Sequence, residues 1–274
     1  MSVFAVDREK CNFCGLCAAE CPAGIIVIKG PEAFPFLARG GQGFCISCGH
    51  CVAVCPPGAI GLETMKPEEC APVRRELLPT PEQLEHFLKS RRSVRVYKEE
   101  PVPREVLAKL IDIARYAPSG HNAQPVQWLV VEDPKEVRRL SGLVVEWMRS
   151  AIKESPELAA LLPLDGVLAA QERGQDPIMR NAPHAIIAHA PRDLPSAQQD
   201  GLIALTYLEL AAYSLGVGAC WAGFVHFAAT SYRPMREALR LPQGHHCLGA
   251  MMVGYPKYNL RRIPLRNEAK IIWR

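Results

Sequence analysis

The sequence predicts an α+β protein of two domains, and three observations support this prediction. The first 63 residues hold eight of the eleven cysteines, whereas the remainder reads as apolar helices mixed with short strands. The length of 274 residues also exceeds one average domain of roughly 100 to 200 residues. We therefore expect a cysteine-rich domain at 1–63, a linker at 64–81 and a larger domain at 82–274.

Composition narrows the class of protein. A hydrophobic fraction of 49% and a charged fraction of 22% are typical of a globular chain with a real core. The net charge of +4 is small and its charges are interspersed, so we expect no nucleic-acid or membrane partner. The N-terminus lacks the pattern of a signal peptide, which favours the cytoplasm.

The apolar stretch 201–224 is long enough to span a bilayer, but it carries Glu209 near its middle. An acid at the membrane centre costs about 2.5 kcal/mol or more on insertion scales. The stretch contains leucines on nearly every face, which predicts a helix buried on all sides. The leucines are Leu202, Leu205, Leu208, Leu210 and Leu215.

The first domain contains an internal repeat. The stretch "CNFCGLCAAECP" at 11–22 matches "CISCGHCVAVCP" at 45–56, a shift of 34 residues. A reduced chain with an odd number of cysteines does not suit a disulfide framework, so metal binding is the leading interpretation. Zinc is the alternative, but zinc usually takes separated cysteine pairs, and two runs of three close cysteines would leave thiolates unused.

Each half reads C-x2-C-x2-C-x3-C-P and resembles the bacterial two-cluster ferredoxins, in which the fourth cysteine reaches the other cluster. Such clusters move single electrons. The resemblance implies one [4Fe-4S] cluster on the first set of ligands and a second cluster on the other. The first set is Cys11, Cys14, Cys17 and Cys55. The second set is Cys45, Cys48, Cys51 and Cys21.

The linker 64–81 contains four prolines and no sustained period, which predicts an extended segment. Cys70 lies within it, and we assign this thiol no role. The next helix has a clear start signal, with Thr80 as N-cap, Pro81 at the first helical position and Gln83 completing a capping box. The second domain begins here.

A cationic cluster follows this helix. Arg91, Arg92, Ser93 and Arg95 offer guanidinium groups and a hydroxyl, which suit a phosphate, although most short basic runs are solvated surface.

A further helix is predicted to stop before Pro118, where the polar loop "PSGHNAQP" at 118–125 leads into a strand at 126–132. The loop amides suit the edge of a heteroaromatic ring, and the alternative is a plain turn from helix to strand.

Four elements in this order resemble the FMN-dependent nitroreductase family over about 84–274: "RRSVR", "APSGHNAQPVQW", "GVGACWAGF", and "VGYP" with "RRIP". The whole chain resembles fusions of a ferredoxin with a nitroreductase. The resemblance implies a nitroreductase-type α+β sandwich with a central buried helix, assembled as an intertwined homodimer.

The resemblance also implies which residues bind FMN. The phosphate and ribityl chain would contact Arg91, Arg92, Ser93 and Arg95. The flavin of the other subunit would be approached by Pro118, Ser119, Gly120 and Asn122. The isoalloxazine would lie along Cys220, Trp221, Ala222 and Gly223, with a backbone N–H near its N5 atom. The phosphate would be closed off by Arg262 together with Arg261.

Some positions depart from the family or remain open. Ala222 stands where many relatives carry an acid, so a mode of donor binding that uses this acid is not expected. Arg180 and Asn181 in "DPIMRNAPH" are additional flavin-contact candidates. No catalytic residue is assigned, and His121 is the histidine to test first.

The sequence therefore predicts an FMN-dependent oxidoreductase that passes electrons between two [4Fe-4S] clusters and FMN to reduce a small electron-poor acceptor, such as a nitro compound or quinone. The electron donor is a ferredoxin-type carrier or NAD(P)H, although no G-x-G-x-x-G motif provides a separate dinucleotide site. A non-catalytic electron-transfer module and a redox sensor are the alternatives.

Overall fold

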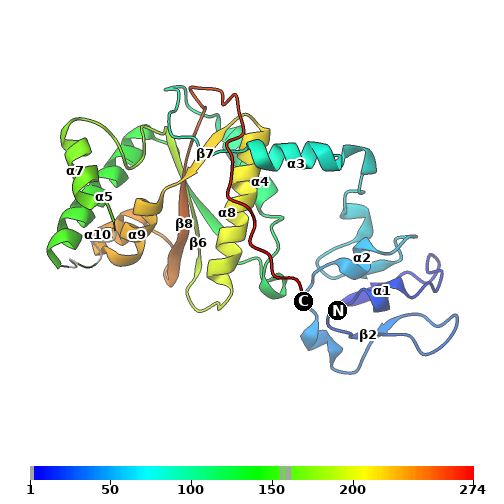
Figure 1. The fold of residues 1–274 in the computed structure, drawn as a ribbon. Coiled ribbons are helices and arrows are strands. Elements are labelled where there is room, and N and C mark those ends of the chain that lie inside the picture. The colour runs from blue at the N-terminus through cyan, green and yellow to red at the C-terminus, as the bar shows by residue number, and fades with distance from the viewer. Residues whose placement is uncertain (1–2, 155–156, 158–161) are drawn as a thin grey trace. The chain divides into compact units, whose positions relative to one another are not determined.

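The computed structural model describes residues 3–154, 157 and 162–274. The chain divides into two compact units. The first comprises Met1–Leu78 with His121–Ala123, and the second comprises Pro79–Gly120 with Gln124–Arg274. The division between Leu78 and Pro79 falls inside the stretch that was predicted to be the linker. Figure 1 labels the elements of both units.

The first unit is built from two small antiparallel sheets and two short helices. Strand β1 (Phe4–Val6) pairs with β4 (Ile60–Leu62), and β2 (Ile26–Val27) pairs with β3 (Phe36–Leu37). The register Ala5↔Gly61 brings the two ends of the unit together.

The repeat in the sequence is also a repeat in the structure. Helices α1 (Leu16–Ala19) and α2 (His50–Ala53) each follow a glycine in the left-handed region, Gly15 at φ 75° and Gly49 at φ 76°. Glycine adopts this conformation without steric cost. Each helix then carries the third cysteine of its motif into the interior.

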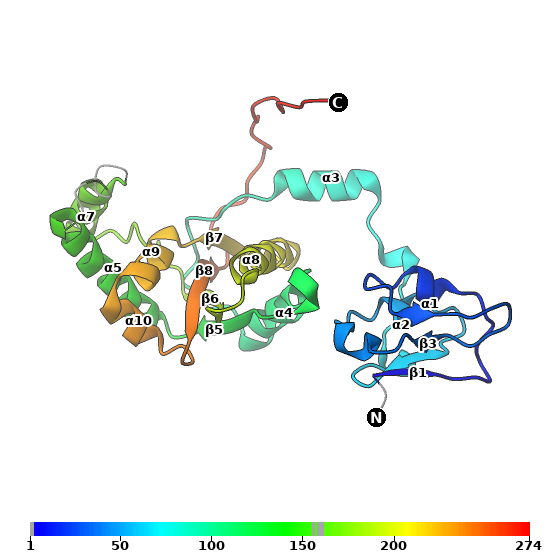
Figure 2. The same cartoon turned by 90° about the horizontal axis from the view of Figure 1, so that it is seen from below.

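The second unit contains one four-stranded antiparallel sheet with the order β5-β6-β8-β7. Its strands are β5 (Gln127–Val131), β6 (His184–Pro191), β7 (Gly218–Trp221) and β8 (His245–Gly254). Helices cover both faces of this sheet (Figure 2), so β6 is buried over nearly its whole length and is mostly apolar rather than alternating, with His184 and His189 as its polar residues.

Among the described residues, two helices lie over one face of the sheet and four lie over the other. The first face is covered by α4 (Arg104–Ala114) and α8 (Ala197–Ser214), whose core includes Leu110, Leu205 and Leu248. The opposite face is covered by a larger helical layer. It consists of α5 (Pro134–Glu154), α7 (Leu164–Glu172), α9 (Gly223–Ser231) and α10 (Arg233–Leu239).

Several local predictions are confirmed. Helix α3 (Pro81–Ser90) begins with the predicted capping box, because the Gln83 amide donates to Thr80 Oγ1 at 3.2 Å and the Thr80 amide donates to Gln83 Oε1 at 2.9 Å. Helix α4 ends before Pro118, and the predicted strand forms as β5. The polar loop between them contains a 3₁₀ turn at Gly120–Asn122.

Helix α8 is central, but a single chain covers only one of its faces. Leu205 and Leu208 are fully buried, whereas Leu202 is 42% exposed and Leu215 41% exposed. The buried face lies unusually close to β8, since a Cβ on Gly201 would approach the Leu248 side chain to 2.6 Å. The leucine pattern predicts that α8 is buried on every side, and a single chain does not provide this burial. Within the described residues, no helix is both long and apolar enough to cross a bilayer.

Candidate functional site

Two groups are found among the eight cysteines of the repeated motifs in the first unit. Burial raises the pKa of Cys51 to about 11, with smaller contributions from the nearby thiols of Cys48, Cys45 and Cys21. Burial likewise raises the pKa of Cys17, and the contributing thiols there are Cys55 and Cys14. Each buried cysteine thus lies near the fourth cysteine of the other motif, which is the crossed arrangement that the sequence predicts.

One group surrounds a cavity. Cys21, Cys45, Cys48 and Cys51 line the same apolar space, together with side chains such as Ile26. In the other group, the Ala59 amide donates to Cys55 Sγ at 3.2 Å. Amide hydrogen bonds to sulfur are one means by which proteins set the potential of iron–sulfur clusters.

These thiols fit a [4Fe-4S] cluster. The described residues contain no group of three or more His, Cys, Asp or Glu side chains arranged around a single metal ion. In a cubane, each of the four irons takes its own thiolate, so the cysteines encircle the cluster instead of meeting at one point. Four cysteines around one apolar cavity match that requirement.

In the second unit, the arginine-rich segment that follows α3 runs beside strand β7. The Val94 amide donates to the Ala219 carbonyl at 3.0 Å. Gly218 permits this approach, because a Cβ there would come within 2.7 Å of the Val94 side chain. The predicted phosphate-binding segment is thereby held next to the predicted isoalloxazine segment.

Arg95 and Ser93 converge on Cys220 of β7. Burial raises the pKa of the Cys220 thiol, while the charges of Arg95 and Arg180 and a hydrogen bond with Ser93 act in the opposite direction. Arg95 and Arg180 also act on the buried phenol of Tyr97, where both guanidinium groups oppose the rise in pKa that burial causes. The structure thus brings together two arginines that are 85 positions apart in the sequence.

A tight turn presents Arg180. The Asp176 carboxylate accepts backbone hydrogen bonds from Ile178, Met179 and Asn181 at 2.9–3.2 Å, and Arg180 adopts a left-handed conformation at φ 54°. Sequence reasoning left this arginine as a candidate because no motif marks it. Among the described residues, no carboxylate forms an ion pair with Arg92, Arg95 or Arg180. Cationic groups without a carboxylate partner, beside a hydroxyl, fit the phosphate of FMN.

Arg91 behaves differently from its neighbours. Its guanidinium forms an ion pair with Glu209 of α8, with Nη1 and Oε1 separated by 2.6 Å. Burial raises the pKa of Glu209, and Arg91 and a hydrogen bond with the Trp221 side chain lower it. Arg91 therefore neutralises a buried carboxylate, which also has a hydrogen bond with Trp221. The predicted contact of Arg91 with the FMN phosphate would compete with this ion pair.

The segment Cys220–Gly223 turns from strand β7 into helix α9. Cys220 and Trp221 pair with Met252 and Met251, and the Ala222 amide donates to the Ala250 carbonyl at 2.8 Å. The Ala222 N–H is therefore occupied. Gly223 is the first residue of α9, and the first amides of a helix have no partner within the helix, so Gly223 is the better candidate to face N5.

The loop predicted to approach the other subunit's flavin is anchored by an acid that sequence reasoning missed. Asp200 is 3% exposed, and its carboxylate accepts the Gly120 amide at 2.9 Å and the Ser196 hydroxyl at 2.8 Å. Ser119 Oγ accepts the Gln124 amide at 2.9 Å and closes the loop. Pro118 and Ser119 line a small pocket with Asp200. His121 and Asn122 adopt left-handed backbone conformations.

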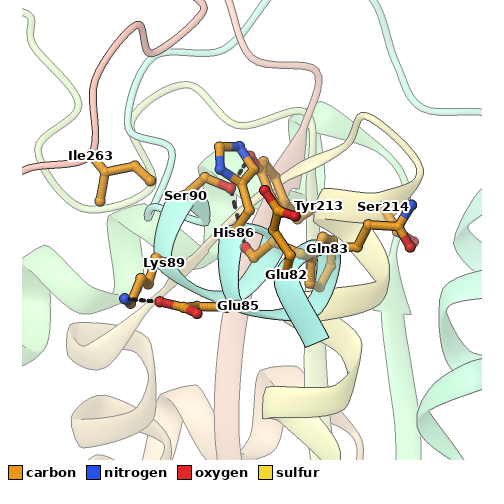
Figure 3. Close-up of a pocket in the computed structure, with 10 residues that line it drawn as sticks. Glu82, Gln83, Glu85, His86, Lys89, Ser90, Tyr213, Ser214 and Ile263 are labelled. Carbon is orange, nitrogen blue, oxygen red and sulfur yellow. Dashed lines mark hydrogen bonds and ion pairs between the residues drawn. The ribbon is translucent and has the colours of Figure 1, made fainter. Parts of the chain in front are cut away.

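Arg261 and Arg262 lie in the exposed segment that follows β8, which forms no regular element in the described chain. Ile263, the next residue, lines an open groove with α3 and the end of α8 (Figure 3). In this groove the Tyr213 hydroxyl donates to Ser90 Oγ at 2.8 Å. This contact fixes the end of α3, from which the arginine-rich segment starts.

Comparison with known proteins identifies both parts of the chain. The model of the nitroreductase family matches residues 88–255, and that of the 4Fe-4S dicluster domain matches residues 10–60. The chain belongs to the nitroreductase family. It is an FMN-dependent oxidoreductase that carries an additional iron–sulfur domain, and its cofactors are FMN and [4Fe-4S] clusters. The iron–sulfur interpretation is thus confirmed over the zinc alternative.

Known relatives match only part of this chain. A protein named NADH dehydrogenase from Thermus thermophilus is 30% identical over 201 residues, which cover 67% of this chain and 92% of the relative. An iodotyrosine deiodinase from Thermotoga neapolitana is 28% identical over 187 residues, covering 66% and 91%. The crystal structure of a Bacteroides fragilis nitroreductase with bound FMN aligns with a TM-score of 0.57 at 22% identity, covering 70% of this chain and 99% of that one.

The crossed ligand arrangement predicts that Cys21→Ala disrupts the same cluster as Cys45→Ala, although Cys21 belongs to the first motif. Each variant purified without oxygen should lose about half of its iron, because each removes one of the four thiolates of one cluster. Iron analysis and electron paramagnetic resonance of the reduced protein would measure this loss. Cys70→Ala is the control and should keep all its iron. A Cys21→Ala spectrum that matches Cys14→Ala instead of Cys45→Ala would contradict the crossing.

Arg180→Gln should weaken FMN binding about tenfold, as should Arg95→Gln, because each removes a charge-assisted hydrogen bond to the phosphate. Fluorescence titration of deflavinated protein with FMN would measure the dissociation constant. Arg138→Gln removes an exposed arginine on α5 and should leave the constant unchanged. Riboflavin, which lacks the phosphate, should bind wild type and both variants equally, and a matching loss for riboflavin would assign these arginines a structural role.

Proposed function

We propose that this enzyme passes electrons between two [4Fe-4S] clusters and FMN to reduce a small electron-poor acceptor, such as a nitro compound or a quinone. The observation that carries the proposal is the combination, in one chain, of two groups of cysteines, each including the fourth cysteine of the other motif, with the Ser93, Arg95 and Arg180 cluster beside β7. Bound FMN supplies the chemistry that links one-electron carriers to two-electron reduction.

The residues of this chain orient the flavin and set the charge around it. Arg95 and Arg180 would neutralise the phosphate and the Ser93 hydroxyl would donate to it, while β7 and the start of α9 would provide a backbone edge for the isoalloxazine. Trp221, which Glu209 fixes through its side-chain hydrogen bond, stands at the end of that edge.

The donor is a ferredoxin-type carrier in this proposal, because single electrons would enter through the clusters. A relative named NADH dehydrogenase supports NAD(P)H as the competing donor. In that case the nicotinamide would approach the flavin directly, since the sequence contains no G-x-G-x-x-G motif for a separate site.

We also propose that the enzyme is a homodimer through the outer face of α8. This face exposes Leu202, Ile203 and Tyr207 at 38–42%, side by side on a helix whose other face is fully buried. A contiguous exposed apolar face of this kind is typical of a subunit interface. The loop at 118–124 is anchored to the N-terminal turn of α8 through Asp200, so pairing of these helices would carry the loop toward the second subunit.

Ile203→Glu should dissociate the dimer, because it places a charge in the centre of the apolar face. Sedimentation velocity should show monomer, and FMN should be lost in parallel since the flavin site needs both subunits. Val73→Glu is the control, as Val73 is 83% exposed outside this face. A variant that is monomeric yet retains FMN at wild-type affinity would contradict the shared site.

Anaerobic reduction tests the order of electron transfer. Reduced ferredoxin should bleach the cluster absorption before the flavin absorption, and the Cys21→Ala variant should slow flavin reduction by ferredoxin while leaving any direct reduction by NADH unchanged. Stopped-flow absorbance with ferredoxin, NADH and NADPH in separate runs would resolve these steps. Bleaching of the flavin by pyridine nucleotide ahead of any cluster change would overturn the proposed order.

Turnover distinguishes the enzyme from a non-catalytic electron-transfer module. The fully loaded protein should reduce a nitroaromatic compound or a quinone at a rate that saturates with acceptor concentration. Absence of saturable turnover with every donor, in protein that holds all its cofactors, would favour the electron-transfer module.

A further inference from the structure

A second cavity lies at the opposite end of β8 from the proposed flavin site. Strand β7 pairs with the C-terminal part of β8, from Met251 to Gly254, whereas this cavity is formed around the start of β8 at His245–Cys247. Helices α9 and α10 complete its wall. Its volume is about 340 Å³, which lies within the range of small-molecule pockets.

The charged side chains that line this cavity are both cationic. They are Arg192 and Arg236; the imidazoles of His245 and His246 lie beside them, and no carboxylate is among the lining residues. In the described part of the chain, neither arginine is paired with an acid. Asp193, the neighbour of Arg192 in sequence, lines an adjoining depression that shares Arg192 and His245 with the cavity, but Asp193 itself is not among the residues that line the cavity.

Both arginines are held by the backbone around them. Arg236 donates one hydrogen bond from Nη1 to the Thr230 carbonyl at 3.0 Å, which leaves four of its five donors for other partners. The Arg192 amide donates to the Gly244 carbonyl at 3.0 Å. This bond continues the antiparallel pairing of β6 and β8 beyond Pro191↔His245 and places Arg192 beside His245.

Each lining histidine has one ring nitrogen committed to the protein. His246 Nδ1 lies 3.2 Å from the Ala190 carbonyl, which can only accept, so this nitrogen carries a proton. His245 Nδ1 lies 2.9 Å from Nδ1 of His189, and one proton is shared between them. The Nε2 atoms of both lining rings are therefore the nitrogens that remain for a ligand.

The remaining walls are neutral. Ala229, Leu239 and Leu241 contribute apolar surface. Burial raises the pKa of the Cys247 thiol to about 12, so this cysteine stays protonated and adds no negative charge at neutral pH. Its sulfur lies 3.7 Å from His226 Nδ1.

We propose that this cavity binds the phosphate group of a small molecule, with Arg192 and Arg236 as its main ligands. Two guanidinium groups and two imidazoles can surround a tetrahedral dianion, and guanidinium groups are preferred ligands for phosphate. The apolar wall suits the carbon part of a phosphate ester, and the volume exceeds what a lone phosphate ion needs. The site is separate from the FMN phosphate site, which draws on residues at the other end of the sheet.

The test uses the full-length protein with FMN and clusters in place, so that the flavin phosphate site is already filled. Isothermal titration with inorganic phosphate and with glucose 6-phosphate should give saturable binding of one ligand per chain. Glucose, which lacks the phosphate, should not bind. Comparison of the two affinities distinguishes a site for free phosphate from a site for a phosphate ester, because the ester binds more tightly if its carbon part contacts the apolar wall.

The Arg192→Gln/Arg236→Gln double variant should weaken binding of both phosphate ligands at least about tenfold, which is the effect expected from loss of charge-assisted hydrogen bonds. Arg233→Gln is the matched control, because Arg233 lies on the same helix but pairs with Glu237 outside the cavity. The flavin absorption spectrum should be unchanged in both variants. Absence of saturable phosphate binding in wild type, or equal weakening in the Arg233→Gln control, would overturn the proposal.

Discussion

The hydrogen bond between Val94 and Ala219 is the contact on which the proposed flavin site depends. Strand β7 is at the edge of the sheet, and its outer backbone groups need partners. The segment at 91–95 supplies one of them, which holds Ser93 and Arg95 against Cys220. Only a glycine at position 218 leaves room for this approach. Backbone pairing at a sheet edge thus determines where the phosphate-binding groups are presented.

The first unit has few residues from which to build a core. Its apolar core is small, and burial raises the pKa of two of its cysteines, Cys17 and Cys51. Thiolates bound to iron need no proton, so cluster binding offsets the cost of burying these groups and couples folding to the metal. In the proposed ligand arrangement, the crossed fourth cysteines would tie the two halves of the repeat to each other, because each cluster would take a ligand from both.

Charge is distributed unevenly over the second unit. The buried Arg91–Glu209 pair is internally balanced and is only weak evidence for stability, since desolvation of both ions opposes their attraction. Its clearer effect is on Trp221 of the predicted isoalloxazine segment, because Glu209 also has a hydrogen bond with the Trp221 side chain. In contrast, four arginines near the two ends of the sheet have no acidic partner among the described residues: Arg95 and Arg180 at one end, and Arg192 and Arg236 at the other. Cationic groups without an acidic partner are what an anionic ligand requires.

The sequence alone determined what local spacing encodes. The cysteine repeat, the capping box at Thr80, the helix that ends before Pro118 and the order of the family motifs could all be read from the sequence, because each depends on residues a few positions apart. Tertiary structure decided how distant side chains meet. The meeting of Arg95 with Arg180, the Arg91–Glu209 pair, the anchoring of Gly120 by Asp200 and the exposed face of α8 join or separate residues that are far apart in the chain. Such contacts depend on how the helices pack on the sheet, and one sequence without its fold carries no signal for them.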